Sequence, residues 1–454
     1  MSSKTMINDL TEGKVGKRLI KFAIPFILAN LLQTCYNLVD MIVVGQYCGQ
    51  AGLSAVSVGG DLLNLFVFSA MGLCSAGQVI ISQYVGKKEY GKLNNTIGTF
   101  STFMIALAIV FTVLGLIFKE TFLELMHVPD EAFKQAYEYT VVSYVGLVFV
   151  FGYNVVSSVL RGMGNSKAPL VFVGIATVVN LILDYILVRY FNAGAAGAAA
   201  ATVFGQGIAF ICAVVYLYKR RDEFGFDFKL KSFIPDKEIL KTLLRLGIPM
   251  ALQTCAINLS NLFVNSFING YGLVASAVTG VGNKINNIAT IVTHAVSAAG
   301  SSMIGQNYAA GKKQRVVKIV GTVALYGLSF ALILSLIMIF FPEQVFAIFD
   351  SSYETVSMAS TYSIIAVLSF FGFASRAPFL ALINGQGNAT LGFAIGVADS
   401  IVARICISLL LGIVFDMGVM GFWLGAVLAG YTYTIVGGIY FFSGKWKKRQ
   451  LAVK

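Results

Sequence analysis

The stretch Gly162-Met163-Gly164-Asn165 has a counterpart 223 residues later in Gly385-Gln386-Gly387-Asn388, and the two share the pattern Gly-x-Gly-Asn. Two further pairs recur at distances of 224 and 225 residues: Ile24-Pro25 with Ile248-Pro249, and Gly86-Lys87-Lys88 with Gly311-Lys312-Lys313. A spacing this constant across most of 454 residues indicates two copies of one structural unit, with almost no insertions between them.

The composition places the chain in a lipid bilayer. Hydrophobic residues make up 57% of it and charged residues only 12%, which leaves too little polar surface to solvate a water-soluble protein of this size. A spanning helix needs roughly 20 apolar residues. Runs of that length predict twelve transmembrane helices, at 19–44, 53–84, 94–118, 134–160, 168–190, 195–218, 241–268, 274–308, 316–341, 357–383, 391–415 and 419–442. The predicted fold is all-α, a polytopic membrane protein of two six-helix lobes.

The distribution of charge predicts the orientation in the membrane. Lysine and arginine gather in alternate loops and in both tails, whereas the opposite loops are mainly acidic. By the positive-inside rule both termini are cytoplasmic, and we expect the chain in the inner (plasma) membrane. Six spans per copy return the chain to the same side, so the copies are related by a pseudo-twofold axis along the membrane normal. The expected domains are an N-lobe at 1–222, a cytoplasmic linker at 223–240 and a C-lobe at 241–454.

Several functional classes are disfavoured by the same residues. An enzyme gathers titratable groups at one place, but the chain has only two histidines, His127 and His294. The net charge of +12 is explained by orientation, so no nucleic-acid partner is expected. The six cysteines lack the paired spacing of a metal or redox site, and no cofactor is expected. No nucleotide-hydrolysing domain is present, so any transport must depend on an ion gradient.

Charged side chains inside the apolar runs are the first candidates for function. Each costs about 2.5 to 3.5 kcal/mol to insert at the bilayer centre, so a charged residue at this depth is a candidate for a functional role. Gln33, Asn37 and Asp40 fall at intervals of four and three, which places them on one face of a helix. We expect this polar stripe to face the protein interior rather than lipid.

A second polar group lies in the fifth and sixth runs. Asn180 and Asp184 are four residues apart and share a face, and Thr202 follows an alanine-rich stretch that permits close helix packing. Two carboxylates, an amide oxygen and a hydroxyl are hard oxygen ligands, suited to sodium or to proton exchange. An alternative stays open, in which Asn180 and Asp184 only hydrogen-bond their helix to its neighbours.

The second copy lacks this acidic pattern. From Ile239 to Pro342, a span of 104 residues, there is no aspartate or glutamate, and the residues matching Asn37 and Asp40 are Asn261 and Asn265. The first copy alone therefore has a carboxylate pair for taking up a cation.

Two other sets of charges need an interpretation. Asp61 and Lys284 hold equivalent positions in the two copies, so they form a candidate gate that pairs when one mouth of a central cleft closes. An alternative stays open, in which Asp61 and Lys284 are each satisfied within their own lobe. Arg376, Asp399 and Arg404 are interpreted as a structural ion-pair cluster, because two cations repel a cationic substrate.

Together these motifs resemble a known family over essentially the whole chain. The motifs are Asp9-Leu10-Thr11-Glu12-Gly13, Pro25, the segment 33–40, Ser82-Gln83-Tyr84 followed by Gly86, and the repeated Gly-x-Gly-Asn. The chain resembles the bacterial multidrug and toxic compound extrusion (MATE) transporters. The resemblance implies two six-helix lobes that export organic cations and other amphipathic toxins in exchange for inward proton or sodium.

The resemblance also implies which residues bind the coupling ion. One branch of the family uses an amino-lobe site, and its four residues are all present: Asp40, Asn180, Asp184 and Thr202. A second branch depends on a carboxylate in the seventh helix, where this chain has Asn258, Asn261 and Asn265. The resemblance therefore favours the amino-lobe site.

The resulting prediction is a monomeric secondary active multidrug efflux transporter, not an enzyme, that works by alternating access in the lipid bilayer. Its coupling ion is proton or sodium, and no metal is expected apart from sodium at the four amino-lobe residues. The candidate substrate cavity is lined by Gln33, Asn37, Asn154, Asn258 and Asn261. The alternatives are a flippase for lipid-linked precursors, which would need a cationic central cavity, and a passive channel or membrane scaffold.

Overall fold

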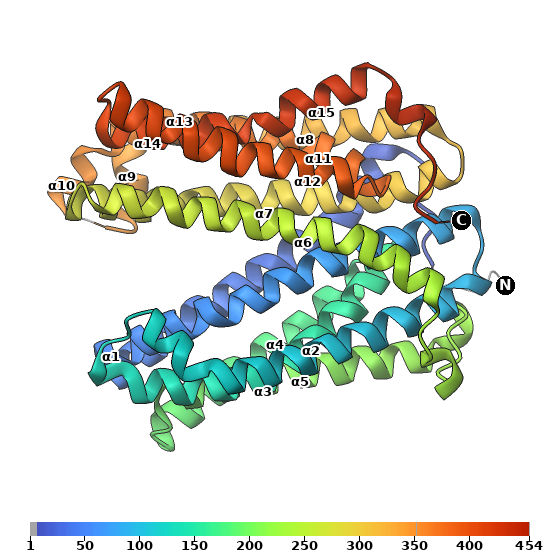
Figure 1. Cartoon of the computed structure of the whole chain (residues 1–454), viewed down its shortest axis with the longest axis horizontal. Helices are drawn as coiled ribbons and strands as arrows, with labels where there is room; N and C mark the ends of the chain where they lie inside the picture. The colour runs from blue at the N-terminus through green and yellow to red at the C-terminus, as the bar shows by residue number, and fades with distance from the viewer. Residues whose placement is uncertain (1–6, 351, 454) are drawn as a thin grey trace. The chain divides into compact units, whose positions relative to one another are not determined.

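The computed structural model describes residues 7–350 and 352–453. Within these ranges the chain forms helices and turns, with no strand (Figure 1). Ten helices of the described ranges are long and apolar enough to cross a membrane. The predicted all-α, polytopic membrane fold is confirmed.

Helix α1 (Val15–Lys87) contains the first two predicted spans. Its 73 residues would measure about 110 Å as one straight helix, far more than the roughly 30 Å of a bilayer core. The helical dihedral angles break at Gly49, with φ 63° and ψ −157°. Only glycine adopts this combination without strain, so Gly49 separates the two spans.

The chain divides into two compact units. One unit contains residues 7–9 and Ile24–Gly247, and the other contains Leu10–Ala23 and 248–453. The chain passes between the units after Asp9, after Ala23 and after Gly247. The last two boundaries each lie two residues before a proline, Pro25 in α1 and Pro249 in α6 (Lys237–Asn269). The predicted linker at 223–240 falls within the first unit.

The first unit is completed by four further helices and a π-helix. They are α2 (Gly91–Leu125), α3 (Asp130–Gly162), α4 (Lys167–Asp184), the π-helix η1 (Tyr185–Tyr190) and α5 (Gly194–Lys219). Two short 3-10 turns, η2 (Arg221–Glu223) and η3 (Leu230–Phe233), follow α5. Small residues allow the helices to approach closely: a Cβ on Gly146 of α3 would lie 2.2 Å from Val203 of α5.

The second unit is also helical, with irregular segments near its end. Its helices after α6 are α7 (Leu273–Ala309), α8 (Lys313–Phe340), α9 (Pro342–Ala347), α10 (Tyr353–Ser357), α11 (Ala359–Gly385), α12 (Ala389–Val397), α13 (Cys406–Leu409), α14 (Gly418–Gly430) and α15 (Thr432–Phe442). The π-helices η4 (Ala398–Ile405) and η5 (Leu410–Val414) interrupt the predicted span 391–415, and the 3-10 turn η6 (Lys445–Lys448) follows α15. Helix α6 matches the seventh predicted span, although its composition is less apolar than that of the ten candidate spans.

The segment Leu10–Ala23, which includes the start of α1, belongs to the second unit. Leu10, Leu19 and Phe22 are buried in a cluster with residues of α7 and α8. The backbone N–H of Leu10 donates to Oε1 of Gln306 at 2.9 Å, and Lys312 Nζ donates to the Thr11 hydroxyl at 2.9 Å. The segment from Leu10 to Phe22 is therefore part of the core of the second unit.

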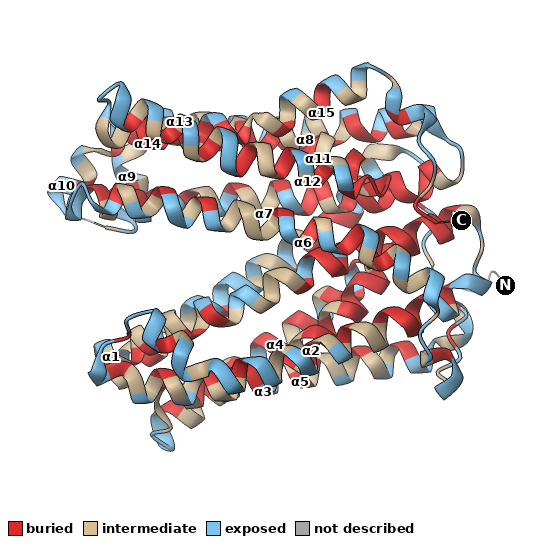
Figure 2. Cartoon of the chain, in the orientation of Figure 1, coloured by how far each residue is buried: buried red, intermediate tan, exposed pale blue. Residues whose placement is uncertain are grey.

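The outward faces of the helices are apolar, as lipid contact requires. Helix α2 has an exposed row of Ile109, Val113 and Ile117, and Figure 2 shows exposed and intermediate positions along this helix. Exposed apolar rows on long helices indicate lipid-facing surfaces rather than a poorly packed core.

The segment after α5 lies along α2 of the same unit. The Thr102 hydroxyl donates to the carbonyl of Phe233 at 2.7 Å, and the N–H of Asp236 donates to Thr99 Oγ1 at 2.9 Å. A Cβ on Gly98 would lie 1.7 Å from the carbonyl oxygen of Ser232. The close contact is possible only because α2 has a glycine here.

Asp227 fixes a turn in this segment. Its Oδ1 accepts hydrogen bonds from the Ser232 hydroxyl at 2.6 Å and from the N–H of Lys229 at 3.1 Å. These bonds, the Ser232 bond first, lower the pKa of Asp227. The turn is therefore fully supported above the ordinary carboxyl pKa, and it loses this support as the pH falls through the lowered value.

We predict that Gly98→Ala destabilises the chain. The added methyl must push the Ser232 carbonyl away from α2, and overpacking of this kind costs about 1 to 3 kcal/mol. The measurement is thermal unfolding of the purified protein in detergent micelles. Gly91→Ala on the same helix, where a Cβ meets nothing within 4 Å, is the control. Equal unfolding temperatures for the two variants would contradict the close contact.

Candidate functional site

A buried group of polar side chains lies in the first unit, where α1, α4 and α5 meet. The hydroxyl of Thr202 donates to Asp40 Oδ2 at 3.2 Å, and Asn180 Nδ2 donates to Thr202 Oγ1 at 3.2 Å. Asp184 completes the group, since its charge interacts with that of Asp40. The structure thus brings together the four residues that the sequence proposed for a cation site.

These side chains are withdrawn from the surface. Asp40 is 8% exposed, Asn180 2% and Asp184 0%. Within residues 7–350 and 352–453, four of their oxygens are buried without a hydrogen-bond partner: Asp40 Oδ1, Asn180 Oδ1 and both carboxylate oxygens of Asp184. Buried acceptors without donors are costly, so this is a site that a proton or a cation would stabilise.

The packing of α5 against α4 sets the geometry of this group. A Cβ on Gly205 would lie 2.9 Å from the carbonyl of Ala176 and 3.3 Å from the Cβ of Asn180. The missing side chain lets the two helices approach, so that Thr202, one turn before Gly205, reaches Asn180. Helix α4 ends at Asp184, where the π-helix η1 begins.

Electrostatics limits what this group can hold. Among the ion pairs of the described residues, none involves Asp40 or Asp184. Two buried carboxylates without a cation repel each other, and removing them from water is itself costly. No group of three or more His, Cys, Asp or Glu side chains suited to a metal occurs in the described residues. The arrangement can bind protons or a single small cation, with a hydroxyl and an amide oxygen as further ligands.

Sequence analysis missed two phenols beside the carboxylates. Tyr36 on α1 and Tyr139 on α3 both lie close enough to interact with the charge of Asp40. Tyr36 precedes Asp40 by four residues, so helical spacing was a usable signal. Tyr139 is placed by α3 packing against Gly59, where a Cβ would lie 2.3 Å from the tyrosine ring, and no local pattern indicates that contact.

The predicted cavity residues are divided between the two units. In the first unit Gln33 and Asn37 are exposed, and Asn154 Nδ2 donates to the carbonyl of Val150 at 2.9 Å. In the second unit Asn258 Nδ2 donates to the carbonyl of Thr254 at 2.9 Å. Asn261 lines a cavity inside the second unit. The role of this set in substrate binding stays a prediction.

The remaining predicted charges are also placed. Asp61 on α1 and Lys284 on α7 are both exposed, in different units, and their pairing as a gate stays a prediction. In the proposed cluster, Arg404 Nη2 pairs with Asp399 Oδ1 at 3.1 Å. Within the described ranges Arg376 lies outside this pair, with its guanidinium 5.7 Å from the ring centre of Phe373.

The fold and the site together are typical of a polytopic membrane carrier. The chain is all-helical and duplicated, and its first copy contains a buried acidic site. Comparison with known proteins gives the family. Residues 25–186 and 249–410 each match the MatE family, once in each copy. The chain belongs to the MatE family, whose members are membrane transporters and not enzymes.

The chain is similar to several bacterial relatives. It is 33% identical to "Probable multidrug resistance protein YpnP" of Bacillus subtilis (strain 168), over 68% of each chain. It is 28% identical to "Probable multidrug resistance protein YoeA" of the same strain, over 97% of this chain and 96% of the relative. A solved structure described as an outward-facing multidrug resistance MATE family transporter has the same fold, with a TM-score of 0.89, 22% identity and coverage of 99% of this chain and 100% of that one.

We predict that Thr202→Val disrupts the buried group. Valine keeps the shape of threonine but removes the hydroxyl, so Asp40 Oδ2 and the amide of Asn180 both lose their partner. The free energy of unfolding should fall by about 1 to 3 kcal/mol, the usual cost of an unsatisfied buried polar group. Unfolding in detergent micelles measures it. Thr202→Ser keeps the hydroxyl and should remain close to wild type, and an equal loss in both variants would rule out the hydrogen bonds as the cause.

Proposed function

We propose that this chain is a secondary active multidrug efflux transporter. It exchanges inward-moving protons or sodium ions for outward-moving organic cations and amphipathic drugs by alternating access. The observation that carries the proposal is the buried pair Asp40 and Asp184, which has no cationic partner among the described residues. Membership of a transporter family supports it, as do the multidrug resistance names of the relatives.

In the proposed cycle, substrate enters from the cytoplasm or the inner leaflet while the acidic group is negatively charged. A cation then arrives from outside and neutralises Asp40 and Asp184, with Thr202 and Asn180 as supporting ligands. Each elementary charge that moves inward through the full field gains about 2.3 kcal/mol per 100 mV. That energy biases the equilibrium between the two states, provided that only one of them binds the cation tightly.

Helix α1 is the element that connects cation uptake to a change of shape. It carries Asp40 and also Pro25, which has no N–H to donate to the carbonyl of Lys21. The missing bond makes this turn the easiest place for α1 to bend. In our proposal, neutralising Asp40 changes how α1 packs within its unit and so changes the bend at Pro25.

The orientation and the coupling ion belong to the same proposal. Both termini face the cytoplasm, the location is the inner (plasma) membrane, and the chain acts as a monomer. The four candidate ligands are all oxygen donors, which suit sodium and protons equally. The chemistry of the ligands is therefore compatible with both coupling ions. Substrate flux measured under separate proton and sodium gradients distinguishes them.

The test is efflux of ethidium from proteoliposomes under a proton gradient and, separately, under a sodium gradient. We predict that Asp40→Asn and Asp184→Asn each reduce gradient-driven efflux by about tenfold or more, within the range of ordinary coupling free energies. Asp222→Asn, at a carboxylate whose side chain is 96% exposed in the same unit, should leave it unchanged.

Two results would contradict the proposal. Undiminished gradient-driven efflux in both variants would remove the acidic group from the mechanism. Ethidium flux that ignores both gradients in the wild-type protein would indicate a passive channel instead.

A further inference from the structure

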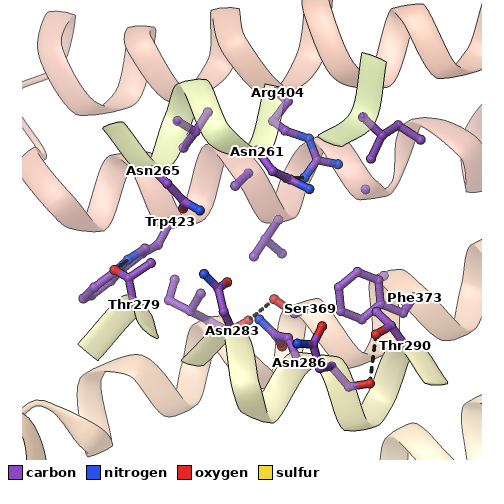
Figure 3. A pocket seen from close by; sticks show the side chains of 18 of the residues that line it. Asn261, Asn265, Thr279, Asn283, Asn286, Thr290, Ser369, Phe373, Arg404 and Trp423 are labelled. Atoms are coloured by element: carbon purple, nitrogen blue, oxygen red, sulfur yellow. Dashed lines mark hydrogen bonds between the residues drawn. The ribbon is translucent and has the colours of Figure 1, made fainter. Parts of the chain in front are cut away.

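The second unit encloses a polar cavity that the proposed ion coupling does not use. Its volume is about 370 Å³, within the usual range for small-molecule sites. Helices α6, α7, α11 and α14 and the π-helix η4 supply its walls. Figure 3 shows Asn261 and Asn265 on one side of the space, facing Asn283 and Asn286 on the other.

The polar lining is rich in amides and has no carboxylate. Five asparagines contribute to it: Asn261, Asn265, Asn283, Asn286 and Asn287. Two arginines, Arg376 and Arg404, are the charged residues of the described lining. Asparagine side chains carry no net charge, so the two arginines determine the sign of the net charge of the cavity lining.

The two arginines are in different electrostatic situations. Arg404 is 8% exposed and is neutralised by its ion pair with Asp399, and its Nη1 also donates to Asn261 Oδ1 at 2.5 Å. Arg376 makes no hydrogen bond or ion pair within residues 7–350 and 352–453, although its charge interacts with those of Asp399 and Arg404. The cavity therefore holds two guanidinium groups against one carboxylate, a net charge of about +1 at a partly buried place where such a charge is costly to leave alone.

Unused hydrogen-bond donors accompany this charge. A guanidinium presents five N–H donors in a planar fork that fits a carboxylate. Because Asn261 Oδ1 already accepts from Arg404, the amide nitrogen of Asn261 remains a donor, with no acceptor in the described part of the chain. A ligand that supplies acceptor oxygens and one negative charge satisfies both groups.

The apolar part of the cavity lining favours an organic ligand over an inorganic ion. Ile257, Val264, Ile365, Phe373 and Trp423 contribute apolar surface beside the polar groups. Trp423 is held in place because its indole N–H donates to Thr279 Oγ1 at 2.9 Å. A small inorganic ion would leave this surface without a partner.

We infer that this cavity binds an amphipathic organic anion through a single carboxylate held at Arg376. A net charge of one positive unit fits a monoanion and leaves a pyrophosphate group under-neutralised. The site goes beyond the proposed efflux of cations, because it accepts a ligand of opposite charge in the unit that lacks the acidic pair.

The protein carries its own reporter for this site. It has two tryptophans, Trp423 in the cavity and Trp446, which is stacked on Phe441 elsewhere in the second unit. The Trp446→Phe variant leaves Trp423 as the single emitter. Titration of this variant in neutral maltoside micelles with 4-nitrobenzoate, a quenching carboxylate, follows occupancy of the cavity without any ion gradient. The result is therefore independent of the efflux assay.

We predict saturable quenching by 4-nitrobenzoate and an affinity about tenfold lower for the neutral 4-nitrobenzamide, a difference of about 1.4 kcal/mol. Arg376→Gln should weaken nitrobenzoate binding by a similar factor and leave nitrobenzamide unchanged. Arg376→Lys keeps the positive charge and should restore part of the difference in affinity between nitrobenzoate and nitrobenzamide. Lys313→Gln removes an exposed charge of the same unit. It should bind nitrobenzoate and nitrobenzamide with the same affinities as the Trp446→Phe protein.

Three outcomes would overturn the inference. They are equal affinities for the acid and the amide, quenching that never saturates, and displacement of nitrobenzoate by inorganic pyrophosphate. If Arg376→Gln does not fold, the affinities of the Trp446→Phe protein for nitrobenzoate and nitrobenzamide still test whether the cavity prefers a carboxylate.

Discussion

Two carboxylates buried together without a cation are the constraint on which the first unit depends. Water is absent from the bilayer core, so the charge of Asp40 and Asp184 has to be balanced by protons or by a bound ion. The Thr202 hydroxyl and the Asn180 amide support this site through two hydrogen bonds of 3.2 Å. Because these side chains come from three helices, a change in the charge of the group acts on the packing of all three.

Small residues make that arrangement possible. Helices in a membrane gain little from apolar burial, since lipid is as apolar as their side chains, and they rely on close approach and on hydrogen bonds. Gly205 brings α5 onto α4 beside Asn180, and Gly146 brings α3 onto Val203 of α5. The alanines and glycines of α5 thus place a hydroxyl where two other helices present an amide and an acid.

Length and hydropathy were enough to predict the helices, because a bilayer allows few alternatives to a helix of about 20 residues. Helical spacing also placed Asn180 and Asp184 on one buried face, whereas the expected inward stripe of α1 holds only for Asp40, since Gln33 and Asn37 are exposed. Contacts between distant segments were beyond such patterns: nothing local indicates that Leu10 packs in the second unit or that Tyr139 reaches Asp40. The predicted cluster of Arg376, Asp399 and Arg404 is an ion pair only in part. Arg404 pairs with Asp399 within one π-helix, Arg376 on α11 interacts with both through charge alone, and both arginines line the same cavity.

Duplication explains how one chain can contain two chemically opposite sites. Each copy inherits the same succession of helices, so a polar position in one has a counterpart in the other, as Asp40 has in Asn265. Between Ile239 and Pro342 the second copy has no aspartate or glutamate, so this part of it has no acidic group with which to attract a cation. Arg376 and Arg404 line the cavity of this copy, where the single carboxylate of Asp399 stands against two guanidinium groups. The two copies therefore share a succession of helices but differ in the sign of the charge they bury, and on that basis we propose ligands of opposite charge for them.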